Sequence, residues 1–228
     1  MRRQGGFTLL ELLMVTVIIA IVATIALPML LASRIDANES AAISTLRTLV
    51  QAQLSFAQRL DADLNGNGNG EYGTFGEMSG NVAVRASAGG SRFLSPTVVN
   101  PSFRLITSLG EMQRSGYIYR LYLPGTGGVG VTELPGGGAS TAVDADLAEA
   151  TWCVYAWPQR VGVTGRRTFF TNQGGDILFT ADPLYSGLGA PIPAGAALAE
   201  PGPPGNIVGP VAVGSTARDG NVWRPHGT

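Results

Sequence analysis

The chain opens with an apolar run that is unusually long. Residues 7–31 contain 25 positions, of which only Glu11 carries a charge. At about 1.5 Å per residue, such a helix is long enough to cross a hydrocarbon layer of roughly 30 Å. Arg2 and Arg3 precede the run, and basic residues favour the cytoplasmic side of a membrane. The pattern therefore predicts a membrane-spanning helix whose first residues are cytoplasmic.

The helix is predicted to continue as an amphipathic segment over residues 32–60. Apolar residues recur there at helical spacing, and charged residues such as Glu39 and Arg47 occupy the opposite side. Pro28 removes one backbone hydrogen bond and should kink the helix. We expect the first half of this helix to lie in a membrane or a filament core, and the second half to pack on a head domain.

The head is predicted to contain a small antiparallel sheet. Segments rich in aromatic and β-branched residues indicate about four strands, at residues 117–123, 151–157, 167–171 and 177–180. The last two are typical of a hairpin, and a short helix is expected within residues 101–114. The predicted fold class is α+β: a long N-terminal helix packed on one face of an antiparallel sheet.

Composition separates the rest of the chain into a head and a tail, and it argues against some classes of function. We expect a globular head over 61–182 and a Pro- and Gly-rich tail over 183–228, with at most an edge strand near 207–213. A formal net charge of -1, from 15 basic and 16 acidic residues, argues against nucleic-acid binding. Cys153 is the only cysteine and His226 the only histidine, so no internal disulfide and no multi-histidine site can form. No group of catalytic residues stands out, and we predict that the protein is not an enzyme.

Three interpretations of the N-terminus compete: a secretory signal, an uncleaved anchor, and a prepilin leader. A secretory signal should have an uncharged core, yet Glu11 lies inside this one, and the best cut, after Ala32, lacks the usual small residue two places earlier. A carboxylate in an apolar helix costs about 2.5–3.5 kcal/mol and usually has a partner. A cut between Gly6 and Phe7 would create an amine four residues before Glu11. The alternative to such a pair is that the helix dipole stabilises Glu11 near the start of the helix, and that its side chain extends to the lipid headgroups.

The string Gly6-Phe7-Thr8-Leu9-Leu10-Glu11-Leu12, followed by the apolar run, resembles the class III leader of type IV pilins and type II secretion pseudopilins. The resemblance extends from Met1 to about Leu60. It implies leader peptide 1–6, cleavage after Gly6, N-methylation of Phe7, and pairing of Glu11 with the N-terminus of a neighbouring subunit. Pro28 matches the position at which helices of this family kink or melt.

The resemblance also implies a role and a set of partners. The chain would be a structural subunit of a helical homo-oligomeric filament, in a type IV pilus or a secretion pseudopilus. Minor pilins or pseudopilins, a prepilin peptidase and an inner-membrane assembly platform with its ATPase would be its partners. The precursor would span the inner membrane once, and the filament would be periplasmic or extracellular. The alternative is a membrane-anchored extracytoplasmic binding module that does not polymerise.

The segment after the amphipathic helix contains a candidate calcium loop. Asp61, Asp63 and Asn65 supply alternating oxygen side chains before Gly66, as in the first half of an EF-hand loop. The closing glutamate of that motif is missing, since Glu71 lies one position too early. A looser calcium loop closed by Glu71 or a backbone carbonyl remains open, and so does a plain Asn- and Gly-rich turn. Some major pseudopilins use calcium, but their ligand positions do not map onto these residues.

Overall fold

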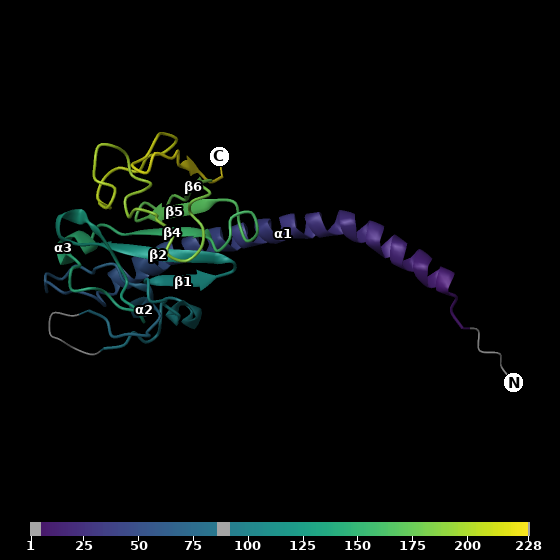
Figure 1. Ribbon diagram of the computed structural model, residues 1–228. Coiled ribbons are helices and arrows are strands. Elements are labelled where there is room, and N and C mark those ends of the chain that lie inside the picture. Colours follow the sequence, from purple (N-terminus) through teal and green to yellow (C-terminus); the bar gives the residue numbers. More distant parts are fainter. Residues whose placement is uncertain (1–5, 86–91, 228) are drawn as a thin grey trace.

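One long helix dominates the molecule in the computed structural model, which describes residues 6–85 and 92–227. Helix α1 (Leu9–Gln58) contains 50 residues, and its first half projects away from a head formed by the rest of the chain (Figure 1). The helix agrees with the prediction of one element running from the apolar run into the amphipathic segment. Arg2, Arg3 and most of the leader lie outside the described residues.

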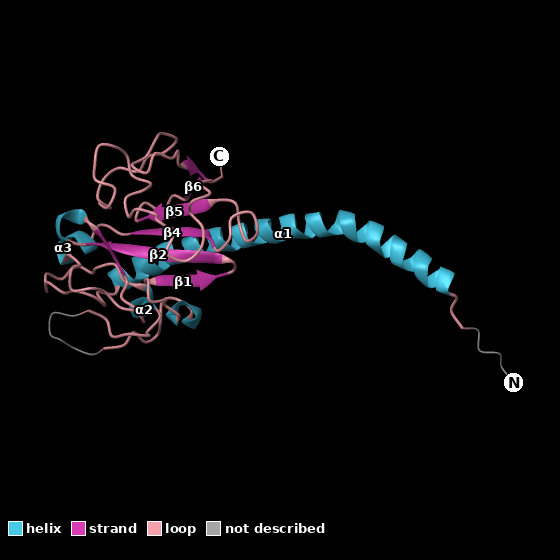
Figure 2. Ribbon diagram, viewed as in Figure 1, coloured by secondary structure: helices cyan, strands magenta, loops and turns pink. Residues whose placement is uncertain are grey.

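The head is built on an antiparallel sheet behind which the second half of α1 runs (Figure 2). The strands are β1 (Glu111–Arg114), β2 (Tyr117–Pro124), β3 (Gly130–Thr132), β4 (Cys153–Pro158), β5 (Thr168–Asn172), β6 (Leu178–Thr180) and β7 (Arg224–Pro225). Their order is β1-β2-β4-β5-β6-β7, and β3 pairs with β2 beyond the end of β1. A long N-terminal helix packed on a small antiparallel sheet is the predicted α+β, pilin-like fold, which is confirmed.

Short helical turns connect these strands. They are α2 (Phe75–Met78), the 3-10 turns η1 (Pro101–Arg104) and η2 (Thr126–Gly128), and α3 (Ala145–Ala148). Asp144 caps α3 by accepting a hydrogen bond from the N–H of Leu147 at 3.1 Å. Of these turns, α3 lies at the end of the head opposite the projecting half of α1 (Figure 1).

All four predicted strands are present, as β2, β4, β5 and β6, but the sheet among the described residues has seven. The expected helix within residues 101–114 is wrong in extent: only the 3-10 turn η1 forms, and β1 follows it. Gly110 and Gly116 flank β1 with φ of 69° and 74°, which end a helix and turn the chain back along β2. The helical spacing of Phe103, Ile106 and Leu109 was therefore a misleading signal.

The sheet is buried on both faces, because alternate side chains enter two separate cores. On one face, residues such as Tyr119, Leu121 and Phe169 pack against Leu46 and Phe56 of α1. On the other face, a second cluster of side chains packs against the C-terminal segment, residues 183–225: Ile118, Tyr155, Trp157 and Phe170 from the strands, with Ile192, Leu198 and Trp223 from that segment.

The C-terminal segment is thus a covering layer, which corrects the expectation of a tail. It contains little regular structure, as predicted, and its only strand among the described residues is β7 rather than one at 207–213. Its side chains are nevertheless deeply buried, and Trp223 is completely enclosed. Burying one large apolar side chain stabilises a fold by about 1.5–3 kcal/mol, so the buried side chains of this segment contribute to the stability of the head.

Candidate assembly and membrane site

The start of α1 carries the residues that the leader motif singles out. Gly6 and Phe7 precede the helix, and the Phe7 side chain is 82% exposed. Thr8 is the N-cap, and its hydroxyl accepts a hydrogen bond from the N–H of Glu11 at 3.2 Å. Glu11 therefore lies in the first turn, where the helix dipole favours a negative charge. A cut after Gly6 would place the new amine one turn from this carboxylate.

The projecting half of α1, residues 9–31, is apolar on every side. All of its large apolar side chains are exposed, and none of the residues in its most apolar stretch is buried by the head. Its two threonine hydroxyls are satisfied within the helix, because Thr16 donates to the carbonyl of Leu13 and Thr24 donates to that of Ile21. A helix with no polar face needs an apolar environment on all sides, which lipid or other apolar helices supply.

Pro28 lies inside α1 without ending it, and the projecting half bends as it leaves the head (Figure 1). Proline cannot donate the hydrogen bond that would reach Thr24, so the helix is weakened on that side. A kink or local melting at Pro28 stays a prediction.

The point at which α1 enters the head is fixed by Glu39. This carboxylate pairs with the guanidinium of Arg167 at 2.6 Å and accepts a hydrogen bond from the N–H of Arg166 at 2.8 Å. The loop between β4 and β5 packs closely on Tyr117 of β2 because Gly165 has no side chain: a Cβ there would lie 2.2 Å from the hydroxyl of Tyr117. Sequence reasoning placed Glu39 on the polar side of the helix, but it is buried and neutralised within the chain.

The candidate calcium residues lie at the other end of α1, and the structure does not bring all four together. Asp61 is buried between Arg59 and Arg92, at 2.9 Å and 2.5 Å. Asp63 instead accepts hydrogen bonds from the N–H groups of residues 66–68 in its own turn. The amide of Asn65 donates to Asp146 and Glu149, at 2.6 Å and 3.0 Å.

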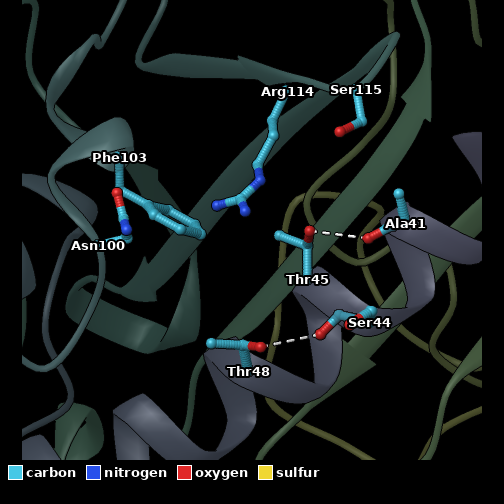
Figure 3. A pocket seen from close by; sticks show the side chains of 8 residues that line it. All are labelled: Ala41, Ser44, Thr45, Thr48, Asn100, Phe103, Arg114 and Ser115. Carbon is cyan, nitrogen blue, oxygen red and sulfur yellow. Dashed lines mark hydrogen bonds between the residues drawn. The ribbon is translucent and has the colours of Figure 1, made fainter.

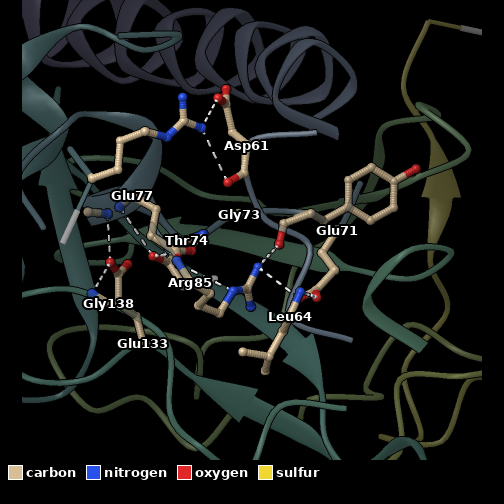
Figure 4. Close-up of polar contacts among 12 residues, drawn as sticks. Asp61, Leu64, Glu71, Gly73, Thr74, Glu77, Arg85, Glu133 and Gly138 are labelled. Atoms are coloured by element: carbon tan, nitrogen blue, oxygen red, sulfur yellow. Dashed lines mark hydrogen bonds and ion pairs between the residues drawn. The ribbon is translucent and has the colours of Figure 1, made fainter. Parts of the chain in front are cut away.

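Glu71 has separate partners in the interior, as Figure 4 shows. It accepts a hydrogen bond from the N–H of Leu64 at 2.6 Å and lies 3.6 Å from the guanidinium of Arg85. Among the described residues, no group of three or more His, Cys, Asp or Glu side chains is placed to hold a metal ion. Calcium binding by the loop therefore stays a prediction, and arginine occupies the positions that a cation would take at Asp61 and Glu71.

A buried group of carboxylates lies beside this loop and was missed by sequence reasoning (Figure 4). Arg85 contacts both Glu71 and Glu77, while Glu133 accepts hydrogen bonds from the N–H groups of Gly76 and Gly138 at 2.7 Å and 3.0 Å. Burial raises the pKa of Glu133 to about 7, and the nearby Glu77 adds to the rise. Burial also raises the pKa of Glu71, although Arg85 opposes the shift.

A hollow of about 220 Å³ opens between α1 and β1, and it has no reactive groups (Figure 3). Thr45 and Thr48 line it, but their hydroxyls donate to carbonyl oxygens of the preceding helix turn at 2.8 Å and 3.0 Å. Arg114 lies over the ring of Phe103, 5.3 Å from its centre. The hollow combines small side chains with one cation and shows no nucleophile or acid–base pair.

Cys153 and His226 lie in different surroundings. The Cys153 thiol is buried in the second core, and burial raises its pKa, so it remains a thiol at neutral pH. His226 packs edge-on against Phe169 near the end of the sheet, where partial burial and the neighbouring Arg167 lower its pKa. The two residues therefore form no shared site.

The leader motif, the apolar projecting helix and the α+β head together define a type IV pilin-like precursor, anchored in a membrane by its N-terminal helix. The family model described as "Prokaryotic N-terminal methylation motif" matches residues 1–27. A second family model, described as "Protein of unknown function (DUF2950)", matches residues 25–182, which is more than half of the chain. The chain therefore belongs to that family. Searches of curated proteins and of solved structures gave no match.

Proposed function

We propose that the protein is a structural, non-enzymatic subunit of a type IV pilus-like or pseudopilus filament. In this proposal a prepilin peptidase cuts the precursor between Gly6 and Phe7, and the new N-terminal Phe7 is methylated. The mature chain then polymerises through the projecting half of α1. The match to the N-terminal methylation motif supports the processing step, and the exposed helix supports the polymerisation step.

The observation that carries the proposal is the unpartnered apolar surface of residues 9–31. The head covers none of it, although the head buries its own apolar side chains in two cores. Lipid covers this surface in the precursor, and the same segments of neighbouring subunits cover it in a filament. Because both environments are apolar, the helix can pass from one to the other without a large change in solvation.

Glu11 has a specific role in this scheme. It is the only charged residue of the projecting half, and among the described residues it makes no ion pair. A carboxylate at that depth costs about 2.5–3.5 kcal/mol unless a cation meets it. We infer that the amine of Phe7 in a neighbouring subunit is that cation, so that the pair sets the axial step between subunits.

The proposal also includes a cellular location for the protein and a set of assembly partners. The precursor lies in the inner membrane with Arg2 and Arg3 in the cytoplasm, and the head lies outside. A platform with its ATPase draws subunits into a homo-oligomeric filament together with minor pilins or pseudopilins, and the filament is periplasmic or extracellular.

The first test is the N-terminus of the native protein in its own host, read by mass spectrometry. We expect a chain that begins at Phe7 and is about 14 Da heavier than its bare sequence, because one methyl group has been added. A chain that begins at Met1 would contradict the proposal and would favour a membrane-anchored binding module.

The second test separates processing from polymerisation. We expect Glu11→Ala to be cut at Gly6 and inserted in the membrane, but absent from sheared filament fractions. Asp36→Ala is the matched control: it removes the next acid along α1, which is exposed and lies beyond the apolar segment. Normal filament assembly by Glu11→Ala would contradict the proposed role of Glu11 in pairing with the neighbouring subunit.

A further inference from the structure

Two loops lie at the end of the head from which the projecting half of α1 emerges (Figure 1). The β4–β5 loop, residues 159–167, is tied to the helix because the amide of Asn38 donates to the carbonyl of Thr164 at 2.9 Å. Glu39 holds the same loop through Arg166 and Arg167. The height of this loop along α1 is therefore fixed at residues 38–39.

The second loop, residues 184–189, lies against the first. The N–H of Gly187 donates to the carbonyl of Pro158 at 3.2 Å, and the N–H of Val161 donates to the hydroxyl of Ser186 at 3.1 Å. The two loops are thus joined to each other at the end of the sheet where β4 ends.

The distance from this surface to the membrane follows from the helix. The apolar segment ends at Leu31, and Asn38 lies seven residues further, or about 10 Å along the helix axis. Headgroups extend roughly 5–7 Å beyond the hydrocarbon on each side of a bilayer. Any tilt of the helix shortens the remaining gap on one side. Long side chains on the loops can therefore reach the headgroup layer.

The side chains at this height are basic and aliphatic. Arg34, Arg160 and Arg166 are exposed, and among the described residues their guanidinium groups form no ion pair. Asp36 is the exposed acid nearby, whereas Glu39 is already neutralised by Arg167. The balance around the β4–β5 loop is therefore positive, whereas Asp182 and Asp219 lie beside the second loop, where they accept hydrogen bonds from the N–H of Leu184 and the hydroxyl of Tyr185.

Three aliphatic side chains accompany the arginines. Val163, Leu184 and Leu188 are 46%, 71% and 55% exposed. We call these three residues together with Arg34, Arg160 and Arg166 the membrane-facing rim. Basic side chains mixed with exposed aliphatic ones are typical of surfaces that lie in the headgroup region of a bilayer.

We propose that the membrane-facing rim binds anionic phospholipid headgroups while the precursor is anchored in the membrane. The arginines bind the phosphates through charge-assisted hydrogen bonds, and the aliphatic side chains enter the boundary between headgroups and acyl chains. This proposal rests on the proposed function, since it takes the projecting half of α1 as the membrane anchor. Its consequence is a head held down on the lipid surface until the subunit is extracted.

The test measures the position of the head above a bilayer. The full chain with Val163→Cys is labelled with a fluorophore and placed in nanodiscs of phosphatidylcholine, alone or mixed equally with phosphatidylglycerol. Cys153 is buried and stays unlabelled. A lipid with a spin label on its headgroup quenches fluorophores that touch the headgroup layer. A second label, on Asn69→Cys at the far end of the head, reports the background.

We expect strong quenching at position 163 in anionic nanodiscs, weak quenching in neutral ones, and none at position 69. Each basic residue favours the anionic surface about fivefold, so Arg34→Gln/Arg160→Gln/Arg166→Gln should lower the bound-to-free ratio of the rim about 100-fold. Raising the salt from 0.1 M to 1 M shortens the screening length from about 10 Å to about 3 Å and should have the same effect.

The control variant Arg47→Gln/Arg104→Gln/Arg224→Gln removes the same charge from exposed arginines outside the rim that form no ion pair among the described residues, and it should leave quenching intact. Equal quenching in neutral and anionic nanodiscs, or equal loss in both triple variants, would overturn the proposal. A signal that appears only when two chains share a nanodisc would overturn it in favour of a second copy. Processing and polymerisation are measured in the host, so their failure would be distinguishable from failure of this lipid test.

Discussion

The two halves of α1 are equally regular as helices but depend on different surroundings. Residues 9–31 are apolar on every side and exposed, whereas residues 35–58 bury one face that includes Leu46, Leu49 and Phe56. The first half has a continuous apolar run, and the second has apolar residues at helical spacing. The pattern of apolar residues, more than their number, therefore determines whether a helix packs in its own chain or against other molecules.

The glutamates of the two halves repeat this contrast. Glu39 has Arg167 and two backbone N–H groups of the same chain as partners. Glu11 has only the first turn of its own helix nearby. One carboxylate therefore joins the helix to the head, and the other is left for a neighbouring molecule.

The largest effect that separates the two halves should come from shortening leucines. Leu46 is fully buried and Leu12 is 59% exposed, so both changes remove the same atoms from different surroundings. We expect Leu46→Ala to lower the free energy of unfolding of the head by about 2–5 kcal/mol, because it leaves a cavity. Leu12→Ala should change that free energy by less than about 0.5 kcal/mol.

The measurement is urea unfolding of the full chain in nanodiscs, followed by tryptophan fluorescence. It reports the head alone, since Trp152, Trp157 and Trp223 are all buried there. Equal destabilisation by the two variants would show that the projecting half contributes to the head after all, and the contrast between the halves would be lost.

A second prediction concerns pH, which should act on the head and not on the projecting half. Glu133 has an ordinary pKa of 4.5 and a folded pKa of about 7, so the folded head binds a proton that the unfolded chain releases. Stability is then greatest below pH 4.5, falls as the pH rises through 7, and levels off above it. The full shift corresponds to on the order of 3 kcal/mol.

Glu133→Gln should flatten this slope while leaving the pH dependence of other groups in place. The variant has to be compared with the unmodified protein because other groups also change stability with pH. Glu71 has a raised pKa and lowers stability as the pH rises, like Glu133, whereas His226 has a lowered pKa and acts in the opposite direction. Urea unfolding between pH 4.5 and 8 checks the slope. An unchanged slope in Glu133→Gln would mean that Glu133 is ionised in the folded head.

The smallest of the three effects should come from the ion pair that joins α1 to the head. We expect Glu39→Gln to cost about 1–2 kcal/mol, since hydrogen bonds to a charged group are strong but Arg167 is partly exposed. Asp36→Asn, on the exposed side of the same helix, should cost less than about 0.5 kcal/mol. The same urea experiment compares the two variants. Equal losses of unfolding free energy would show that the Glu39–Arg167 ion pair does not fix the junction between α1 and the head.

Much of the fold follows from local patterns in the sequence. The apolar run and its amphipathic continuation predict α1 almost to its ends, and the aromatic segments predict four strands at nearly their observed positions. These elements are predictable because each one is stabilised by side chains whose spacing matches its own geometry. The leader motif is equally local, since seven consecutive residues carry it.

The parts that could not be predicted depend on distant partners. Strand β1 exists because it pairs with β2, and β7 exists because β6 leaves an edge for it. The covering layer had one local signal: strands such as Tyr117–Pro124 are apolar at nearly every position, which indicates a sheet buried on both faces. The pairing of Glu39 with Arg167 joins residues 128 positions apart, and no local pattern indicates it.

The continuity of α1 through the junction has a mechanical consequence. A force that pulls the projecting half along its axis passes through the backbone hydrogen bonds of α1, of which only the one at Pro28 is missing, into residues 35–58. There the load is shared by side chains that interlock with the sheet, and by the Glu39–Arg167 pair at the point of entry. The head is therefore pulled in shear along its whole core rather than peeled from one end, and it should follow the helix as a rigid body.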